Sequence, residues 1–210
     1  MQPTHDDLRN LISNNPGQGT FEEYAHLLDT IVQRAPANLL IFGVGRDSTL
    51  WYHANKGGRT VFIEHEPTWI AQTQAQLPDA QIVPVRYWTR RWLWPLLLGV
   101  GDALFLRELP EDVQRERWDI IFVDSPQGGK WTRPGRMQSL YTAAQLARQA
   151  GRANVHSSRS ESHQNAPGHH VDLLAHDCDR TVEQVYCNRY FAAESLVRTT
   201  RTLRHYRIAV

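Results

Sequence analysis

Short apolar runs alternate along the chain with longer stretches in which apolar residues recur every three or four positions. The short runs suit strands that are buried on both faces, and the longer stretches suit amphipathic helices. The pattern predicts strands over residues 39–42, 60–64, 81–86, 118–123 and 171–175. Helices are predicted over residues 4–14, 48–55, 67–76, 137–150 and 180–191, and another after Thr20.

This order of elements predicts an α/β protein with a Rossmann-like fold. Residues 195–210 alternate apolar with polar positions, which predicts a closing β-hairpin. We therefore expect a seven-stranded, mostly parallel sheet with helices on both faces and one antiparallel strand from the hairpin. N-terminal helices occupy residues 1–36, and we expect residues 1–210 to form a single domain because no repeat or linker interrupts them.

Two segments depart from the regular pattern. Residues 154–168 are rich in Ser, His and Asn, a composition typical of a flexible insertion or lid. Residues 89–106 are rich in Trp, Arg and Leu. We expect Trp88, Trp92 and Trp94 to be buried, and the alternative is that they stack on a sugar or an aromatic substrate.

Composition narrows the classes of partner and location. The chain has 23 basic and 22 acidic residues, and no basic tract is dense enough to indicate a nucleic-acid partner. The N-terminus is polar, and the longest apolar piece, residues 92–100, is too short to span a membrane. Cys178 and Cys187 lack metal-ligand spacing, so we expect two buried thiols. We expect a cytoplasmic protein; the pattern specifies no oligomeric state.

A glycine-rich turn follows the first predicted strand. Gly43 permits a tight turn, and Gly45 leaves the backbone bare beside a ligand at the start of the next helix. Asp47 and Ser48 follow, where a dinucleotide-binding loop has a third glycine. Because a carboxylate repels a pyrophosphate and attracts a cation, the loop favours S-adenosylmethionine (SAM), which carries an ammonium and a sulfonium. The alternative is that Asp47 or Ser48 only caps the helix.

Residues after the next two strands complete the predicted cofactor site. Glu64 ends the second strand, where a carboxylate is placed to accept both ribose hydroxyls; Glu66 is the second choice. Tyr87 and Trp88 follow the third strand and are candidates for one face of an adenine ring, although core packing explains them equally well.

Acidic residues follow the fourth and fifth strands. Asp124 ends the fourth, and His176, Asp177 and Asp179 come after the fifth. Methyl transfer from a sulfonium needs an aligned and activated acceptor oxygen. Either a carboxylate or His176 acts as general base, or Asp124, Asp177 and Asp179 hold a divalent cation, Mg or Mn, that acidifies a hydroxyl. The structural alternative is a helix cap at Asp179 and an ion pair between Asp177 and Arg180.

Basic and aromatic residues follow Asp124 in a loop punctuated by glycine and proline. Lys130, Arg133 and Arg136 lie there with Trp131. Arginine binds a carboxylate in bidentate fashion, so the loop indicates an acidic sugar or small-molecule acceptor held by Arg133, Arg136 and Trp131. Exposed loop charges explain the same spacing equally well.

Motifs in a fixed order resemble the DUF579 family, which includes plant glucuronoxylan 4-O-methyltransferases. The resemblance runs from about Gly19 to the C-terminus through TFEEY, RAPANLLIFGVGRDSTLW, FIEHEPTW, VRYWT, LPEDV, WDIIFVDSPQGG, PGRM and HDCDR followed by VE. It implies a class I SAM-methyltransferase fold and SAM-dependent methylation of the 4-hydroxyl of glucuronic acid side chains. It also implies that Gly43, Gly45, Asp47 and Glu64 bind the cofactor. Asp124 matches the family's DAPRG loop motif, and His176, Asp177 and Asp179 match its HDVDR motif.

The chain departs from the family pattern at one informative place. It reads DSPQGG where the family usually has an arginine before the glycine, so the residue that binds the acceptor's acid group is not assigned by the resemblance. We expect a methyltransferase acting on a uronic acid or related sugar. The alternatives are a small-metabolite acceptor and a non-catalytic relative that binds SAM or sugar.

Overall fold

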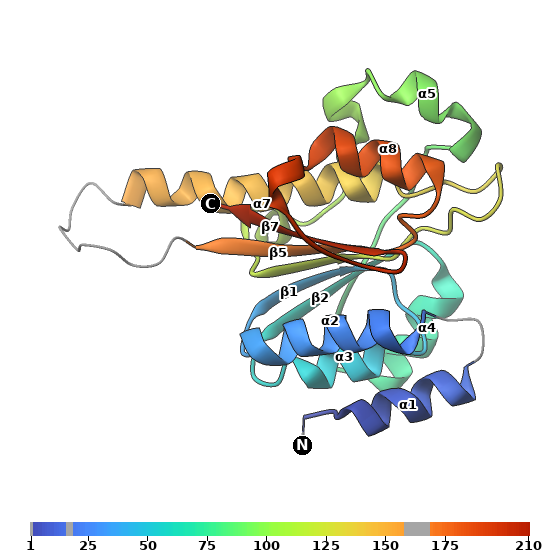
Figure 1. Cartoon of the computed structure of the whole chain (residues 1–210), viewed down its shortest axis with the longest axis vertical. Helices are drawn as coiled ribbons and strands as arrows, with labels where there is room; N and C mark the ends of the chain where they lie inside the picture. The colour runs from blue at the N-terminus through green and yellow to red at the C-terminus, as the bar shows by residue number, and fades with distance from the viewer. Residues whose placement is uncertain (1, 16–18, 158–168) are drawn as a thin grey trace.

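The computed structural model describes residues 2–15, 19–157 and 169–210. These residues form a seven-stranded sheet in the order β3-β2-β1-β4-β5-β7-β6, with helices on both faces (Figure 1). The parallel strands are β1 (Asn38–Phe42), β2 (Arg59–Glu64), β3 (Gln81–Pro84), β4 (Ile120–Val123) and β5 (His170–Ala175). The hairpin of β6 (Leu196–Thr200) and β7 (Leu203–Ala209) places β7 antiparallel to β5. The predicted α/β fold and its closing hairpin are confirmed.

The helices form two layers around the sheet (Figure 1). One layer holds α1 (His5–Asn14), α2 (Phe21–Arg34), α3 (Ser48–Ala54) and α4 (Pro67–Gln76). The other holds α7 (Met137–Ser157) and α8 (Thr181–Tyr190), with the short helix α5 (Trp94–Leu97). The short helix α6 (Glu111–Arg115) packs against α7. Three 3-10 turns complete the described helices: η1 (Arg91–Leu93), η2 (Gly101–Leu104) and η3 (Ala193–Ser195).

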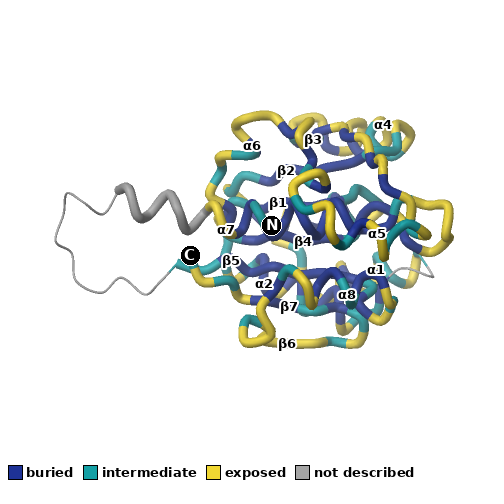
Figure 2. Tube along the Cα trace, turned by 90° about the horizontal axis from the view of Figure 1, so that it is seen from above, coloured by how far each residue is buried: buried dark blue, intermediate teal, exposed yellow. Residues whose placement is uncertain are grey.

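The central strands are buried on both faces because each layer covers alternate side chains. Leu40 and Phe42 of β1 pack in the cluster under α7 and α8, whereas Leu39 and Ile41 pack in the cluster with α2 and α3. Fully burying one such side chain stabilises the fold by about 1.5–3 kcal/mol. β6 is the exposed edge (Figure 2). The buried strands give the loops at their carboxyl ends a rigid base.

Local signals predicted most element bounds. Thr20 caps α2 in a capping box with Glu23, and α4 begins at Pro67 and ends at Gln76 as expected. The predicted end of α7 at residue 150 is wrong, because the helix continues to Ser157. The first residues of the predicted insertion, 154–157, are therefore helical. The rest of that insertion, 158–168, lies outside the described residues.

Two expectations about burial had opposite outcomes. The thiols of Cys178 and Cys187 are buried as predicted, with their sulfurs 3.6 Å apart. The expected burial of the tryptophans is wrong for Trp88 and Trp92, which are 50% and 57% exposed.

No helix in the described part of the chain is both long and apolar enough to cross a bilayer.

The strand order creates a crevice at the carboxyl ends of β1 and β4. The chain passes from β1 outward to β2 and β3 on one side, and later returns to β4 and β5 on the other. Open α/β sheets bind ligands at such a reversal, because the loops on the two sides diverge there. The glycine turn after β1 and the acidic loops after β4 and β5 therefore face one another.

Candidate active site

A cavity of about 630 Å³ lies in this crevice, within the roughly 300–1,000 Å³ of small-molecule sites. Its lining has more carboxylates than guanidinium groups. The guanidinium groups are those of Arg136 and Arg180, and the carboxylates are those of Glu23, Asp47, Glu64, Glu66, Asp124 and Asp177. An excess of one charge in a cleft attracts the opposite charge, so the cavity favours a cationic ligand.

Glycine is required in the turn after β1 for steric reasons. Gly43 has a φ of +118°, and a Cβ there would lie 2.9 Å from Cβ of Ser125, in the loop after β4. A Cβ on Gly45 would lie 2.9 Å from Oδ1 of Asp47. Because glycine has no Cβ, the loop after β4 can approach the turn at Gly43, and the Asp47 carboxylate can approach it at Gly45.

Asp47 and Ser48 serve the turn in different ways. The buried Ser48 hydroxyl accepts a hydrogen bond from the Gly45 N–H at 2.8 Å. Asp47 stands at the N-cap of α3 but makes no side-chain cap; its carboxylate accepts from Nε1 of Trp51 at 2.9 Å. Burial, followed by the negative charge of Asp124, raises the pKa of Asp47. A nearby cation would relieve both effects.

Glu64 ends β2 with its carboxylate turned under the glycine turn. Oε2 accepts from the Val44 N–H at 3.0 Å, and Oε1 accepts from the Glu66 N–H at 2.8 Å and from His65. Burial would raise the pKa of Glu64, but the hydrogen bonds from His65 and the backbone outweigh it and lower the pKa. Because Oε1 is filled, Oε2 is the oxygen with room for a further donor. If Glu64 binds the ribose hydroxyls as predicted, Oε2 is therefore the oxygen that accepts their hydrogen bonds.

Tyr87, predicted as an adenine contact, does not line the cavity. It is 8% exposed, belongs to the core cluster, and shares a hydrogen bond of 3.1 Å with the Ser139 hydroxyl. The residues that line this side are His65, Glu66 and Trp69 at the start of α4. Tyr87 contacts the cavity-lining His65 edge-on, with 5.2 Å between the ring centroids. Trp69 is the aromatic residue that sequence reasoning missed.

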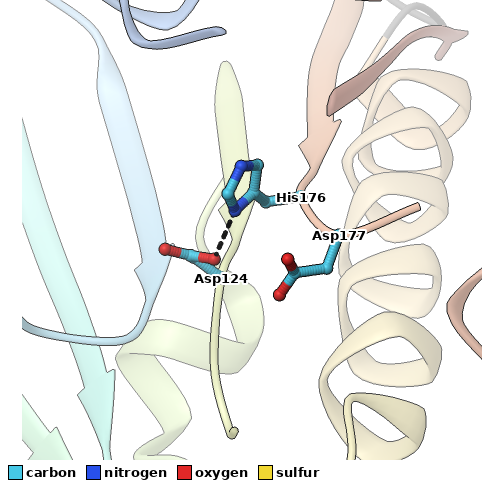
Figure 3. A group of neighbouring side chains, drawn as sticks. All are labelled: Asp124, His176 and Asp177. Carbon is cyan, nitrogen blue, oxygen red and sulfur yellow. Dashed lines mark hydrogen bonds and ion pairs between the residues drawn. The ribbon is translucent and has the colours of Figure 1, made fainter. Parts of the chain in front are cut away.

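Asp124, His176 and Asp177 meet on the opposite wall (Figure 3). Oδ1 of Asp124 lies 3.0 Å from Nδ1 of His176. Nε2 of His176 is buried, has no hydrogen-bond partner among the described residues, and lies 3.6 Å from Glu23. Asp177 adopts a left-handed backbone conformation, with φ of 60°, that turns the chain just after β5. The predicted meeting of the two acidic loops is confirmed.

Arg136, predicted as an acceptor-binding or an exposed loop residue, is buried and neutralises this wall. Its guanidinium lies 2.7 Å from Asp124 and 2.5 Å from Asp177, and it also donates to the backbone carbonyls of Asp124 and His176. The side chain is 4% exposed. Nη1 and Nη2 of Arg136 thus donate to the protein's own oxygens. Nε is buried and has no hydrogen-bond partner in the described part of the chain. Arg180, which pairs with Asp177 at 2.7 Å, is 31% exposed and also lines the cavity.

The electrostatics of the wall favour a charged His176. Burial works to lower the pKa of His176, but the hydrogen bond and charge of Asp124 outweigh it and raise the pKa to about 9. Burial likewise works to raise the pKa of Asp124, and the charges of Arg136 and His176 outweigh it and lower the pKa. The wall therefore holds an ionised carboxylate between two cations.

The remaining predicted residues lie outside this cluster. Asp179 is exposed and does not join Asp124, His176 and Asp177, whose candidate ligand atoms lie within 4.8 Å of one another. Arg133 and Trp131 are exposed and do not line the cavity, although Arg133 lies 3.9 Å from Glu66 at its edge. The predicted metal set of Asp124, Asp177 and Asp179 is therefore not assembled. One oxygen of Asp124 and one oxygen of Asp177 are bound by Arg136, so a positive charge already lies between the two carboxylates.

Glu23 and Tyr24 of α2 are further site residues that sequence reasoning did not assign. Glu23 is 2% exposed, and hydrogen bonds from Thr202 and Thr20 overcome the effect of burial and lower its pKa to about 2. Tyr24 packs edge-on against Trp51, with centroids 5.3 Å apart. Both fall at helical spacing with core residues, and only the capping box distinguished Glu23 in the sequence.

Comparisons with known proteins agree with this geometry. The sequence profile of the family described as IRX15/IRX15L/GXM matches residues 22–100 and 99–206. Glucuronoxylan 4-O-methyltransferase 3 of Arabidopsis thaliana is 30% identical over 93% of this chain and 66% of its own length. Arabinogalactan O-methyltransferase 2 of the same plant is 30% identical over 93% of this chain and 69% of its own. The chain thus spans about two thirds of the length of these relatives.

Solved structures show the same fold. The O-methyltransferase from Bacillus cereus in complex with SAH superposes with a TM-score of 0.52, at 15% identity, over 99% of this chain and 91% of that one. The class I methyltransferase fold implied by the motifs is confirmed.

Proposed function

The chain belongs to the IRX15/IRX15L/GXM family, and on that premise we propose that it is a SAM-dependent O-methyltransferase acting on a uronic-acid-bearing sugar. The observation that carries the proposal is His176, whose Nδ1 contacts Asp124 inside an acidic cavity and whose Nε2 has no hydrogen-bond partner among the described residues. The names of two relatives support O-methylation of a plant polysaccharide.

The glycine-loop side of the cavity fits the methyl donor. Asp47 faces the crevice with a carboxylate whose pKa is raised, and Oε2 of Glu64 has room for a hydroxyl donor. Trp69 and His65 supply aromatic surface beyond β2. When bound, SAM supplies an activated methyl group. The protein's part is to attract its positive charge, hold its ribose, and exclude water.

His176 is placed to take the proton that leaves the acceptor hydroxyl. If Nδ1 carries a proton, it donates to Asp124, and in the neutral ring Nε2, which lies 3.6 Å from Glu23, is then the acceptor. Asp124 fixes the ring and stabilises the imidazolium that forms, as a carboxylate does beside any catalytic histidine. In the unliganded site the pKa of about 9 keeps both nitrogens protonated. A cationic ligand beside Asp47 and Asp124 lowers the pKa of His176. We therefore expect His176 to lose its proton and become a base once the donor is bound.

The 4-hydroxyl of glucuronic acid is the acceptor that we propose. Its neighbouring carboxylate needs a cation at the cavity wall, and Arg180 is the more exposed of the two guanidinium groups there. We therefore assign acid binding to Arg180 in place of Arg136, with bidentate geometry providing the specificity. Asp177 holds Arg180 in position. The cytoplasmic location stays a prediction from the sequence.

The arrangement supports a metal-free reaction, because Arg136 already supplies the positive charge between Asp124 and Asp177. Adding Mg or Mn after exhaustive chelation should therefore leave the rate unchanged. If adding either ion restores lost activity, the result would instead support the metal-assisted reaction, which the sequence predicts as an alternative.

A screen with labelled methyl donor tests the function directly. The purified chain is incubated with labelled SAM and either glucuronate-bearing oligosaccharides or a metabolite extract, and the labelled product is identified by mass spectrometry. Label on glucuronate O4 supports the proposal. Label on a metabolite alone would establish the small-molecule alternative, and SAM binding without transfer to any acceptor would favour a non-catalytic role.

A further inference from the structure

Exposed tryptophans gather beside the cavity. Of the seven large apolar side chains that are exposed in the described part of the chain, five fall between residues 88 and 131, and three of these are Trp88, Trp92 and Trp131. Trp131 is the most exposed of the three at 58%. Single exposed apolar side chains are common on soluble proteins, whereas exposed apolar side chains that gather in one place mark binding sites. We call the exposed side chains of Trp88, Arg90, Trp92, Trp131 and Arg133, with the half-buried Arg91, the tryptophan ribbon.

The ribbon is built by two segments that hydrogen bonds hold side by side. The Arg91 N–H donates to the Arg133 carbonyl at 2.8 Å, and the Trp92 N–H donates to the Trp131 carbonyl at 3.2 Å. The Thr89 hydroxyl donates to the Pro134 carbonyl at 3.1 Å. Residues far apart in sequence are therefore fixed in one strip, although the loop before α7 has no regular structure of its own.

An alternation of burial turns one row of side chains outward. From residue 83 to residue 90 the odd positions, Val83, Val85, Tyr87 and Thr89, are buried and the even positions are exposed. Side chains two apart in extended backbone point to the same face. Trp88 and Arg90 therefore face solvent together, while Tyr87 is directed into the core.

Positive charge accompanies the aromatic surface. The Arg91 guanidinium lies over the Trp131 ring at 5.2 Å from its centroid. Arg90 and Arg133 are exposed beside Trp92 and Trp131. An indole offers a flat apolar surface for the C–H face of a sugar ring, and an arginine offers paired donors for a carboxylate. The chemistry of the ribbon thus matches an acidic oligosaccharide.

The ribbon continues into the mouth of the cavity. Gln127, Gly128 and Gly129 form part of the cavity wall, and Trp131 follows them two residues later. Arg133 reaches toward Glu66 on the opposite side, at 3.9 Å. Figure 1 shows α5, which continues the first segment, and the yellow loop before α7 on the same side of the sheet as α8. A sugar chain that leaves the cavity past Gly129 would meet Trp131 first.

We propose that the tryptophan ribbon binds the sugar residues next to the methylated uronic acid of an acidic oligosaccharide or polysaccharide, and that this contact makes long acceptors better substrates than a monosaccharide. This inference rests on the proposed function. Binding to flanking sugars is the same in the ground state and the transition state, so it lowers KM for long acceptors and leaves kcat unchanged.

Kinetics on acceptors of two lengths test the inference. The acceptors are methyl glucuronide and a longer glucuronate-bearing xylo-oligosaccharide; the variants are Trp92→Ala, Trp131→Ala and Trp131→Phe. Each alanine variant should lower kcat/KM on the oligosaccharide about tenfold, or about 1.4 kcal/mol, through KM. It should leave kcat/KM on methyl glucuronide unchanged, and Trp131→Phe should retain most of the activity. Val197→Ala on the opposite edge strand, where Val197 is 49% exposed, is the control and should match the wild type on both acceptors.

Three results would overturn the inference. They are an equal loss on both acceptors, no loss on either, or a change from dimer to monomer in sedimentation of the alanine variants, which would make the ribbon a contact between copies. Failure of the proposed function is a separate outcome. If neither acceptor is methylated, calorimetry with the same oligosaccharide decides: binding that the alanine variants lose supports the ribbon, and no binding by the wild type refutes it.

Discussion

Oδ1 of Asp124 lies 3.0 Å from Nδ1 of His176, and this contact joins the loops after β4 and β5 across the floor of the cavity. It leaves Nε2 as the ring nitrogen that has no hydrogen-bond partner in the described part of the chain, and it raises the pKa of His176. The measurable properties of the site therefore depend on this pair.

Protonated His176 should stabilise the folded chain over a defined pH range. Its pKa is about 9 when folded and 6.5 ordinarily, so the folded state binds the proton more tightly. The stabilisation is complete below pH 6.5 and is lost as the pH rises through 9, amounting to at most about 3 kcal/mol. Urea unfolding of the wild type and His176→Gln at several pH values measures it. The gap between the two should narrow from pH 6.5 to 9.5; a constant gap would refute the raised pKa.

Binding of a cationic donor should lower the pKa of His176. SAM and S-adenosylhomocysteine differ by the methyl group and the sulfonium charge, so they form a matched pair of ligands. We expect NMR titration of the His176 ring to show a lower pKa in the SAM complex than in the S-adenosylhomocysteine complex, because only the first adds a positive charge at the sulfur. Equal pKa values in the two complexes would remove donor binding as the trigger for base formation.

Asp124→Asn and Asp177→Asn should slow methyl transfer while leaving donor binding in place. Asparagine keeps the shape of each side chain, and it tolerates the left-handed backbone at position 177. Loss of Asp124 removes the group that orients His176, so kcat should fall by about 100-fold or more. The exposed Asp179→Asn is the matched control and should retain full activity. Calorimetry with SAM and steady-state rates measure both effects; normal rates in Asp124→Asn and Asp177→Asn would end the assignment.

Glu64→Ala should weaken SAM binding by about 1–3 kcal/mol, because the Val44 and Glu66 N–H groups lose their acceptor together with the ribose. Glu66→Ala, at a neighbouring carboxylate that is 44% exposed, should cost much less. Titration calorimetry on the two variants compares them. An unchanged affinity in Glu64→Ala would place the ribose elsewhere.

The parts of the site that the sequence predicted are those with a local signal. A few neighbouring positions are enough to predict the turn at Gly43 and Gly45, which follow an apolar run. The same holds for the acidic residues that follow the strands. The parallel order of β1, β4 and β5 then brings Asp124 and Asp177 together without further information. The capping box of Thr20 and Glu23 is local in the same way.

Roles that depend on contacts across loops were predicted less well. Arg136 lies in a loop of glycine and proline where exposed charge is the ordinary case, and only the meeting of three segments makes it a buried counterion. Tyr87 has the parity of Val83 and Val85, and that alternation already pointed to the core. Aromatic residues are usually buried, so the sequence predicts burial of Trp88 and Trp92, which is wrong. Their exposure depends on which segment covers them, and no local pattern specifies that.

A crystal structure with S-adenosylhomocysteine and a glucuronate-bearing oligosaccharide tests the central claim most directly. We predict the ribose at Glu64 and the sulfur facing the acceptor O4, with that oxygen within hydrogen-bond distance of Nε2 of His176. A nucleoside bound outside this cavity, or Asp124 and His176 turned away from the acceptor oxygen, would contradict the account.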